Sequence, residues 1–85
     1  MIIIYGASWC GWCQKAKALA EQYQLDFDYR DIDNPEIKEQ LRVILPITAP
    51  KTIPQIWWHG RHVGGHDDFV RAIEETLSNY GHEPC

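Results

Sequence analysis

Residues 1–13 read MIIIYGASWCGWC, an apolar run followed by a turn and then by a closely spaced pair of cysteines. The run Met1–Tyr5 is short, continuous and rich in isoleucine, which is typical of a buried strand. Residues 6–8, Gly-Ala-Ser, leave this strand as a turn. An Ala-, Lys- and Leu-rich stretch with helical spacing starts at Cys13. The sequence therefore places Cys10 and Cys13 where a strand ends and a helix begins.

This junction favours the chemistry of thiolates. A helix N-terminus presents unpaired N–H groups and a partial positive charge, and both stabilise an anionic sulfur. The thiolate is the nucleophile in thiol–disulfide exchange, and two intervening residues let the second thiol reach back and close a disulfide. We therefore expect Cys10 to be the catalytic nucleophile. Cys13, one turn into the helix and more buried, is expected to resolve the mixed disulfide.

The first half of the chain alternates strands and helices. Apolar side chains recur at helical spacing from Cys13 to about Tyr23. Residues 27–32 alternate between apolar and polar, as a half-exposed strand does. Residues 33–36, Asp-Asn-Pro-Glu, combine a capping side chain with proline in the first turn, which predicts the start of a second helix. Its apolar side chains fall between Ile37 and Leu45.

The second half predicts a loop, a hairpin and a last helix. Residues 46–54 contain three prolines and cannot form regular structure. Residues 55–58 and 61–63 are predicted strands joined by a tight turn at residues 59–60, His-Gly. Asp67 or Asp68 is expected to cap a helix that ends at Gly81. The order β-α-β-α-β-β-α combines a parallel pair with an antiparallel hairpin, so the fold class is α/β with a mixed sheet.

Composition limits the classes of function. The 85 residues are enough for one domain, 1–85, and 45% of them are hydrophobic. The net charge is −4 without any basic run, so nucleic-acid binding has little support. No stretch reaches the length of a membrane span. Three cysteines make a poor disulfide framework, since one of them must stay unpaired. We therefore expect the reducing cytoplasm, where cysteine pairs are usually catalytic or metal-binding. We also expect a monomer.

Three motifs in order and in register resemble the glutaredoxins. They are Cys-X-X-Cys after the first strand, Thr-Ile-Pro-Gln at residues 52–55, and Gly-Gly-His-Asp-Asp at residues 64–68. The resemblance covers nearly the whole chain and implies a thioredoxin-like fold, with a four-stranded mixed sheet and three helices. It also implies a thiol–disulfide oxidoreductase that draws electrons from glutathione. The expected substrates are protein disulfides and glutathione mixed disulfides, and ribonucleotide reductase is one implied recipient of electrons.

The resemblance also implies a glutathione site. The peptide bond between Ile53 and Pro54 would be cis, and the exposed backbone of Ile53 would pair with the cysteine part of glutathione. A glycine at position 65 would let the backbone approach the ligand closely. His66 and Asp67 would then meet the γ-glutamyl end of glutathione. A lysine before the Thr-Ile-Pro motif would face the glycyl carboxylate. The implied glutathione-binding residues are Lys51, Ile53, Pro54, Gly65, His66 and Asp67.

Two alternatives share the redox-active pair. Residues 9–11, Trp-Cys-Gly, are similar to thioredoxin, and Ala7 stands where glutaredoxins often have Lys or Arg. Both features favour a redoxin reduced by thioredoxin reductase, whereas residues 64–68 argue against it. Gly11 replaces the usual proline between the cysteines. Glutaredoxins with a small residue there can hold a glutathione-ligated [2Fe–2S] cluster between two subunits, so a cluster carrier is the second alternative.

A third alternative is a zinc-binding module. His82 and Cys85 form a His-X-X-Cys pair that has plausible spacing for structural zinc together with Cys10 and Cys13. This reading leaves the other two redoxin motifs unexplained, so the main hypothesis includes no metal site. His62, which is close in sequence to two further histidines, is expected to be an exposed residue of the hairpin.

Overall fold

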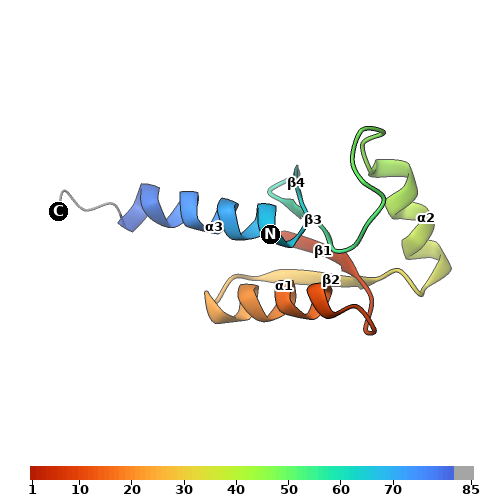
Figure 1. Cartoon of the computed structure of the whole chain (residues 1–85), viewed down its shortest axis with the longest axis horizontal. Coiled ribbons are helices and arrows are strands. Elements are labelled where there is room, and N and C mark those ends of the chain that lie inside the picture. The colour runs from red at the N-terminus through yellow and green to blue at the C-terminus, as the bar shows by residue number, and fades with distance from the viewer. Residues whose placement is uncertain (82–85) are drawn as a thin grey trace.

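The computed structural model describes residues 1–81, with side chains described for residues 1–76 (Figure 1). The predicted order of elements is confirmed, and the predicted mixed sheet is present. The elements are β1 Ile2–Gly6, α1 Gly11–Gln22, β2 Phe27–Asp31, α2 Pro35–Ile44, β3 Gln55–Trp58, β4 Arg61–Gly64 and α3 His66–Gly81. No helix in this described part is both long enough and apolar enough to cross a membrane.

The sheet has the strand order β2-β1-β3-β4. Strand β1 pairs in parallel with β2 and antiparallel with β3, so Ile4 lies between Tyr29 and Ile56. Strands β3 and β4 form the predicted antiparallel hairpin, with a register irregularity between Ile56 and Trp57. The central position of β1 means that the turn after it, which leads to the cysteine pair, emerges from the middle of the sheet.

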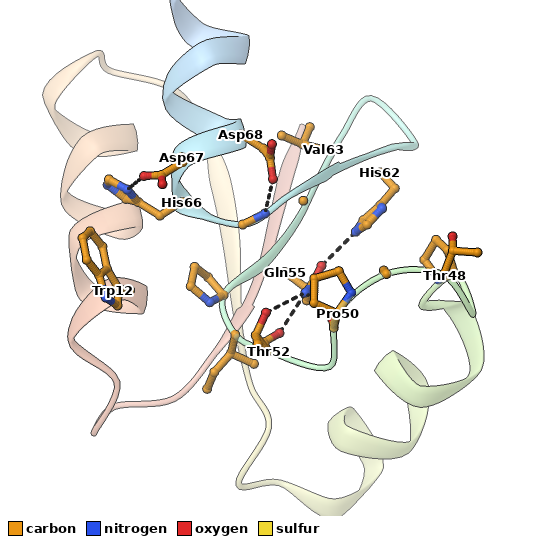
Figure 2. A pocket seen from close by; sticks show the side chains of 16 residues that line it. Trp12, Thr48, Pro50, Thr52, Gln55, His62, Val63, His66, Asp67 and Asp68 are labelled. Atoms are coloured by element: carbon orange, nitrogen blue, oxygen red, sulfur yellow. Dashed lines mark hydrogen bonds and ion pairs between the residues drawn. The ribbon is translucent and has the colours of Figure 1, made fainter.

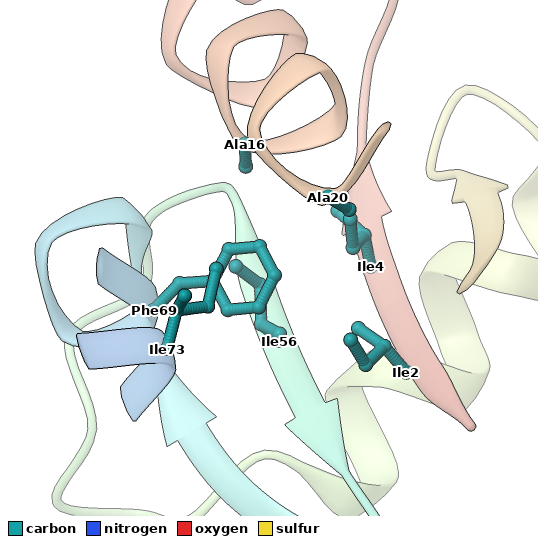
Figure 3. Close-up of a cluster of buried hydrophobic side chains, with 7 residues drawn as sticks. All are labelled: Ile2, Ile4, Ala16, Ala20, Ile56, Phe69 and Ile73. Atoms are coloured by element: carbon teal, nitrogen blue, oxygen red, sulfur yellow. The ribbon is translucent and has the colours of Figure 1, made fainter. Parts of the chain in front are cut away.

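One face of the sheet carries the main hydrophobic core. Side chains alternate between faces along a strand, and Ile2 and Ile4 of β1 point to the same side. Helices α1 and α3 cover that side, and α1 contributes two alanines that let it approach closely (Figure 3). The buried residues of this core are Ile2, Ile4, Ala16, Ala20, Ile56, Phe69 and Ile73.

Helix α2 contacts β2, and a polar cluster ties it to the central strand. The buried Tyr5 donates a hydrogen bond from its hydroxyl to Gln40 Oε1 at 2.9 Å. Arg30 of β2 donates to the same Gln40 oxygen at 2.8 Å and to the Tyr5 hydroxyl at 3.1 Å. Because Tyr5 alternates with Ile4 along β1, this cluster lies on the sheet face opposite to the main core.

Helix starts differ slightly from the sequence-based expectation. Helix α2 begins as predicted, with Asn34 Oδ1 accepting from the Glu36 N–H at 3.0 Å. Helix α3 begins at His66, so the expectation that Asp67 or Asp68 precedes it as the cap is wrong. Gly65 instead holds that position, since its carbonyl accepts from the Phe69 N–H at 2.9 Å. The Asp68 carboxylate reaches back to the Gly65 N–H at 3.2 Å, as in a capping box.

Candidate active site

The cysteine pair lies at the N-terminus of α1. Cys10 is the N-cap residue, with extended backbone angles of φ −96° and ψ 114°, and its Sγ accepts from the Cys13 N–H at 3.2 Å. A sulfur here takes the place of the oxygen that Ser or Asp usually supplies at an N-cap. Cys10 is half-buried, whereas Cys13 is fully buried. The helix begins at Gly11, which places Cys10 at its N-terminus and Cys13 in its first turn.

Cys13 is packed against the end of β1. A Cβ atom placed on Gly6 would lie 2.8 Å from Cys13 Sγ, so only glycine leaves room for this thiol. Burial, followed by the neighbouring Cys10, raises the pKa of Cys13 to about 12. The Ala7 backbone and the Tyr29 hydroxyl act in the opposite direction and lower that pKa. At neutral pH Cys13 is therefore a protonated thiol in the reduced protein.

A loop brings the backbone of Ile53 beside the pair. The Ile53–Pro54 peptide bond is cis, as the resemblance implied. The Ile53 carbonyl accepts a contact from Cys10 Sγ at 3.9 Å, although 43 residues separate the two. The attacking sulfur expected from sequence therefore faces a backbone group that is also available to a bound peptide.

A groove of about 520 Å³ runs beside this point (Figure 2). Its walls are Trp12 of α1, the loop 46–54 and the start of α3. The structure brings five of the six expected glutathione contacts into its lining, namely Ile53, Pro54, Gly65, His66 and Asp67. Lys51, the sixth, is exposed and lies outside the lining, between two residues that belong to it.

Trp12 and His66 form one wall of the groove. Their ring centroids are 5.1 Å apart, and the rings are tilted by 50°. His66 Nδ1 lies 3.3 Å from the Asp67 carboxylate, whose side chain is 90% exposed and free to meet a ligand (Figure 2). Lys15 Nζ lies 4.5 Å from the centroid of the Trp12 ring, on which it packs as a cation. Ala7 is fully buried and supplies no charge here.

Gln55 and His62 are site residues that the sequence analysis did not identify. Gln55 is only 1% exposed, and its Nε2 donates to the carbonyls of Pro50 at 3.1 Å and Thr52 at 2.9 Å. This fixes the orientation of the amide, so Gln55 Oε1 accepts at 2.8 Å from His62 Nε2, which carries the proton (Figure 2). The network fastens the loop that carries Ile53 to the sheet.

The expectation that His62 is an exposed residue of the hairpin is wrong. Its side chain is half-buried, contacts Gln55, and packs on Trp57 with ring centroids 4.7 Å apart. A strand pattern alone does not reveal this, because the ring is covered by Gln55 and Trp57 of the neighbouring strand β3. The signal in the sequence that could have indicated a buried role for His62 was Gln55. An amide buried at the start of a strand requires hydrogen-bond partners, and His62 is one of them.

The zinc alternative involves residues beyond the described part of the chain. His82 and Cys85 both lie outside the described residues. Within the part that the structure describes, no group of three or more His, Cys, Asp or Glu side chains is arranged to hold a metal ion.

Comparisons with known proteins agree with this geometry. The glutaredoxin family model matches residues 2–63. Glutaredoxin-C8 of Oryza sativa subsp. japonica is 35% identical over 80 residues, covering 86% of this chain but only 56% of the rice protein. The chain thus spans little more than half of that relative's length.

Solved structures give the same relationship. Reduced Escherichia coli glutaredoxin superposes with a TM-score of 0.72 at 34% identity, covering 91% of this chain and 96% of that one. A buckwheat glutaredoxin–glutathione complex shares the fold with a TM-score of 0.74 at 21% identity, covering 88% and 69%. The predicted thioredoxin-like fold is confirmed, and the chain belongs to the glutaredoxin family.

Proposed function

We propose that this chain is a glutathione-linked thiol–disulfide oxidoreductase that reduces protein disulfides and glutathione mixed disulfides through Cys10 and Cys13. One observation carries the proposal: Cys10 Sγ caps a helix N-terminus and contacts the Ile53 carbonyl beside the groove. An anionic sulfur is stabilised at that position by the Cys13 N–H and by the helix. The buried Cys13 is one turn away, where it can attack Cys10.

The reaction proceeds in two exchanges. The Cys10 thiolate attacks a substrate disulfide, forms a mixed disulfide, and releases the other substrate sulfur as a thiolate that takes up a proton. Cys13 loses its proton and attacks Cys10 Sγ, which forms the Cys10–Cys13 disulfide and releases the second substrate thiol. Two molecules of glutathione then reduce this disulfide and leave as oxidised glutathione. When the substrate is itself a glutathione adduct, a second glutathione can resolve the mixed disulfide on Cys10 alone.

The groove supports glutathione as the partner. A volume of about 520 Å³ suits a small peptide, and the Ile53 backbone can pair with its cysteine residue. The first N–H groups of α3 have no partner within the helix, so they can bind the γ-glutamyl carboxylate. The exposed Asp67 carboxylate can bind the ammonium group. Lys51 lies in the loop 46–54 that also carries Ile53, where it can bind the glycyl carboxylate. The buckwheat neighbour was solved as a complex with glutathione.

The test is turnover of a small glutathione mixed disulfide, with glutathione and glutathione reductase regenerating the donor. The wild-type chain is expected to turn over, Cys10→Ser to lose all activity, and Cys13→Ser to retain turnover of the glutathione adduct while losing reduction of a protein disulfide. Turnover by Cys10→Ser would refute Cys10 as the nucleophile. Full protein disulfide reduction by Cys13→Ser would refute the dithiol mechanism.

Three further measurements test the alternatives and the proposed recipient of electrons. Reduction of the Cys10–Cys13 disulfide by thioredoxin reductase, without glutathione turnover, would assign the chain to the thioredoxin-like alternative. Visible absorption by freshly purified protein would favour the [2Fe–2S] alternative that Gly11 permits. Ribonucleotide reductase stays a proposed recipient of electrons, and its reduction is measured by adding it as the final acceptor. The proposed compartment is the reducing cytoplasm, where a dithiol pair serves catalysis.

A further inference from the structure

A polar cluster lies behind the buried thiol of Cys13. Tyr29, in the middle of β2, donates from its hydroxyl to the Ala7 carbonyl at 3.1 Å. Gln14 Nε2 donates to the Tyr29 hydroxyl at 3.2 Å and to the same carbonyl at 3.1 Å. The Tyr29 hydroxyl is thus held by groups from α1 and from the turn that precedes it.

This hydroxyl is a close neighbour of Cys13 Sγ. A Cβ atom on Gly6 would lie 2.7 Å from Tyr29 Oη and 2.8 Å from Cys13 Sγ, so both atoms border the same point above the glycine. Only a residue without a side chain at position 6 allows the phenol and the thiol to meet there. In the reduced protein the hydroxyl donates to the Ala7 carbonyl, and its proximity to the sulfur lowers the pKa of Cys13.

The resolving step requires the buried Cys13 thiol to ionise. In the mixed disulfide, Cys10 Sγ is bonded to the substrate and carries no charge, so its repulsion of a Cys13 thiolate disappears. Burial remains as the obstacle to ionisation of Cys13, because the side chain is fully buried. Hydrogen-bond donors directed at the sulfur stabilise a thiolate that forms in such a buried position.

We propose that Tyr29 is a positioning residue for the resolving step, whose hydroxyl, held by Gln14, turns to donate a hydrogen bond to Cys13 Sγ as the thiolate forms. The inference rests on the proposed dithiol mechanism and adds to it a residue of β2. Tyr29 keeps its own proton throughout. The Cys13 thiolate forms a bond to Cys10 Sγ, the bond from Cys10 to the substrate sulfur breaks, and the departing thiolate takes up the proton that Cys13 lost.

The charges around Tyr29 agree with a donor rather than a base. Burial, followed by the nearby thiols of Cys13 and Cys10, raises the pKa of Tyr29 to about 12, so the phenol stays protonated at neutral pH. Asp31 on the same strand acts in the same direction. Lys17 Nζ lies 5.3 Å from the centroid of the ring. All of these groups remain in a Tyr29→Phe variant, which removes only the hydroxyl.

The size of the expected effect follows from two opposing factors. Loss of one hydrogen bond to an anion raises a thiol pKa by about one to two pH units. Each unit lowers the thiolate fraction about tenfold but makes the thiolate about threefold more nucleophilic, which leaves a net loss of about threefold. Tyr29→Phe should therefore slow the resolving step about three- to tenfold.

The experiment separates the two exchanges in one reaction. Reduced protein carrying Cys85→Ser is mixed with an aromatic disulfide that releases a coloured nitrothiobenzoate at each exchange. The first phase reports attack by Cys10, and the second reports attack by Cys13. Tyr29→Phe is expected to leave the first phase within twofold of the parent and to slow the second about three- to tenfold below the Cys13 pKa. Tyr23→Phe, which removes an exposed hydroxyl on α1's C-cap, is the matched control and should change neither phase.

The outcomes distinguish the inference from the proposed function. An unchanged second phase in Tyr29→Phe, with the parent's dependence on pH, would overturn the role of Tyr29. Equal slowing of both phases would also overturn it, because that is the result of a merely structural perturbation. Absence of the first phase in the parent would instead refute Cys10 as the nucleophile, and with it the proposed function.

Discussion

Replacing Gln55 with Leu tests whether the buried amide holds the active-site loop in place. Leucine has a similar volume but no polar atoms, so the change removes hydrogen bonds without opening a large cavity. The carbonyls of Pro50 and Thr52 lose the donor that now lies 3.1 and 2.9 Å away. His62 loses its 2.8 Å partner as well, but its half-buried ring can turn towards water.

The magnitude follows from the two bonds to the loop. At about 0.5–1.5 kcal/mol each, their loss should lower the free energy of unfolding by about 1–3 kcal/mol. For a domain of this size each 1 kcal/mol lowers Tm by about 4–8 °C. Because the loop presents Ile53 to the ligand, we expect KM for a glutathione mixed disulfide to rise about fivefold for each 1 kcal/mol lost locally, with kcat unchanged.

Thermal unfolding followed by circular dichroism gives the stability, and the glutathione-coupled assay gives KM and kcat. Gln22→Leu on the exposed end of α1 is the matched control, and it should stay within about 0.5 kcal/mol of the parent. A Gln55→Leu protein with the parent's Tm and KM would refute the reasoning that this amide holds the loop.

Three further predictions concern the frame of the site. Gly6→Ala should lower the free energy of unfolding by about 1–3 kcal/mol in denaturant unfolding, because the added methyl group overpacks against Tyr29 and Cys13. Gly11→Ala is the control and should be tolerated, since the space around Gly11 is open. Equal stability of the two variants would contradict the packing. Tyr5→Phe should cost about 0.5–1.5 kcal/mol in the same measurement, because the buried hydroxyl bonds α2, and no loss would show that bond to be neutral. The reduced protein should lose stability as pH rises from about 9 towards 12, since the folded state keeps the Cys13 proton while the unfolded chain releases it. Cys13→Ala should flatten this loss in Tm measured against pH, and an identical slope would contradict the raised pKa.

Much of the fold could be predicted because its signals are local. The isoleucine run before Gly6, the Asn-Pro start of α2 and the His-Gly turn each determine the backbone within a few residues. The sequence does not reveal that the side chain of Cys10 caps α1, because cysteine is an uncommon N-cap residue. Its sulfur accepts the Cys13 N–H as an oxygen would, and propensity rules do not anticipate that role.

The site could be predicted only where a motif marks it. The cysteine pair and residues 64–68 are each a short motif in the sequence. Residues 64–68 line the groove, and Cys10 contacts the carbonyl of Ile53, which also lines it. Tyr29 and His62 act through contacts across strands and loops, which no spacing rule encodes. Each looks like an ordinary strand residue in the sequence. Gly6 leaves the space in which Tyr29 lies near Cys13, and Gln55 is the hydrogen-bond partner of His62.

The most direct test of the central claim is to trap the glutathione adduct. Cys13→Ser protein is treated with oxidised glutathione, and the modified residue is identified by mass spectrometry of the intact chain and of its peptides. We expect one glutathione on Cys10, since this sulfur caps the helix, contacts the Ile53 carbonyl and lacks its resolving partner in the variant. An unmodified Cys10, with glutathione absent or attached only to Cys85, would contradict the account.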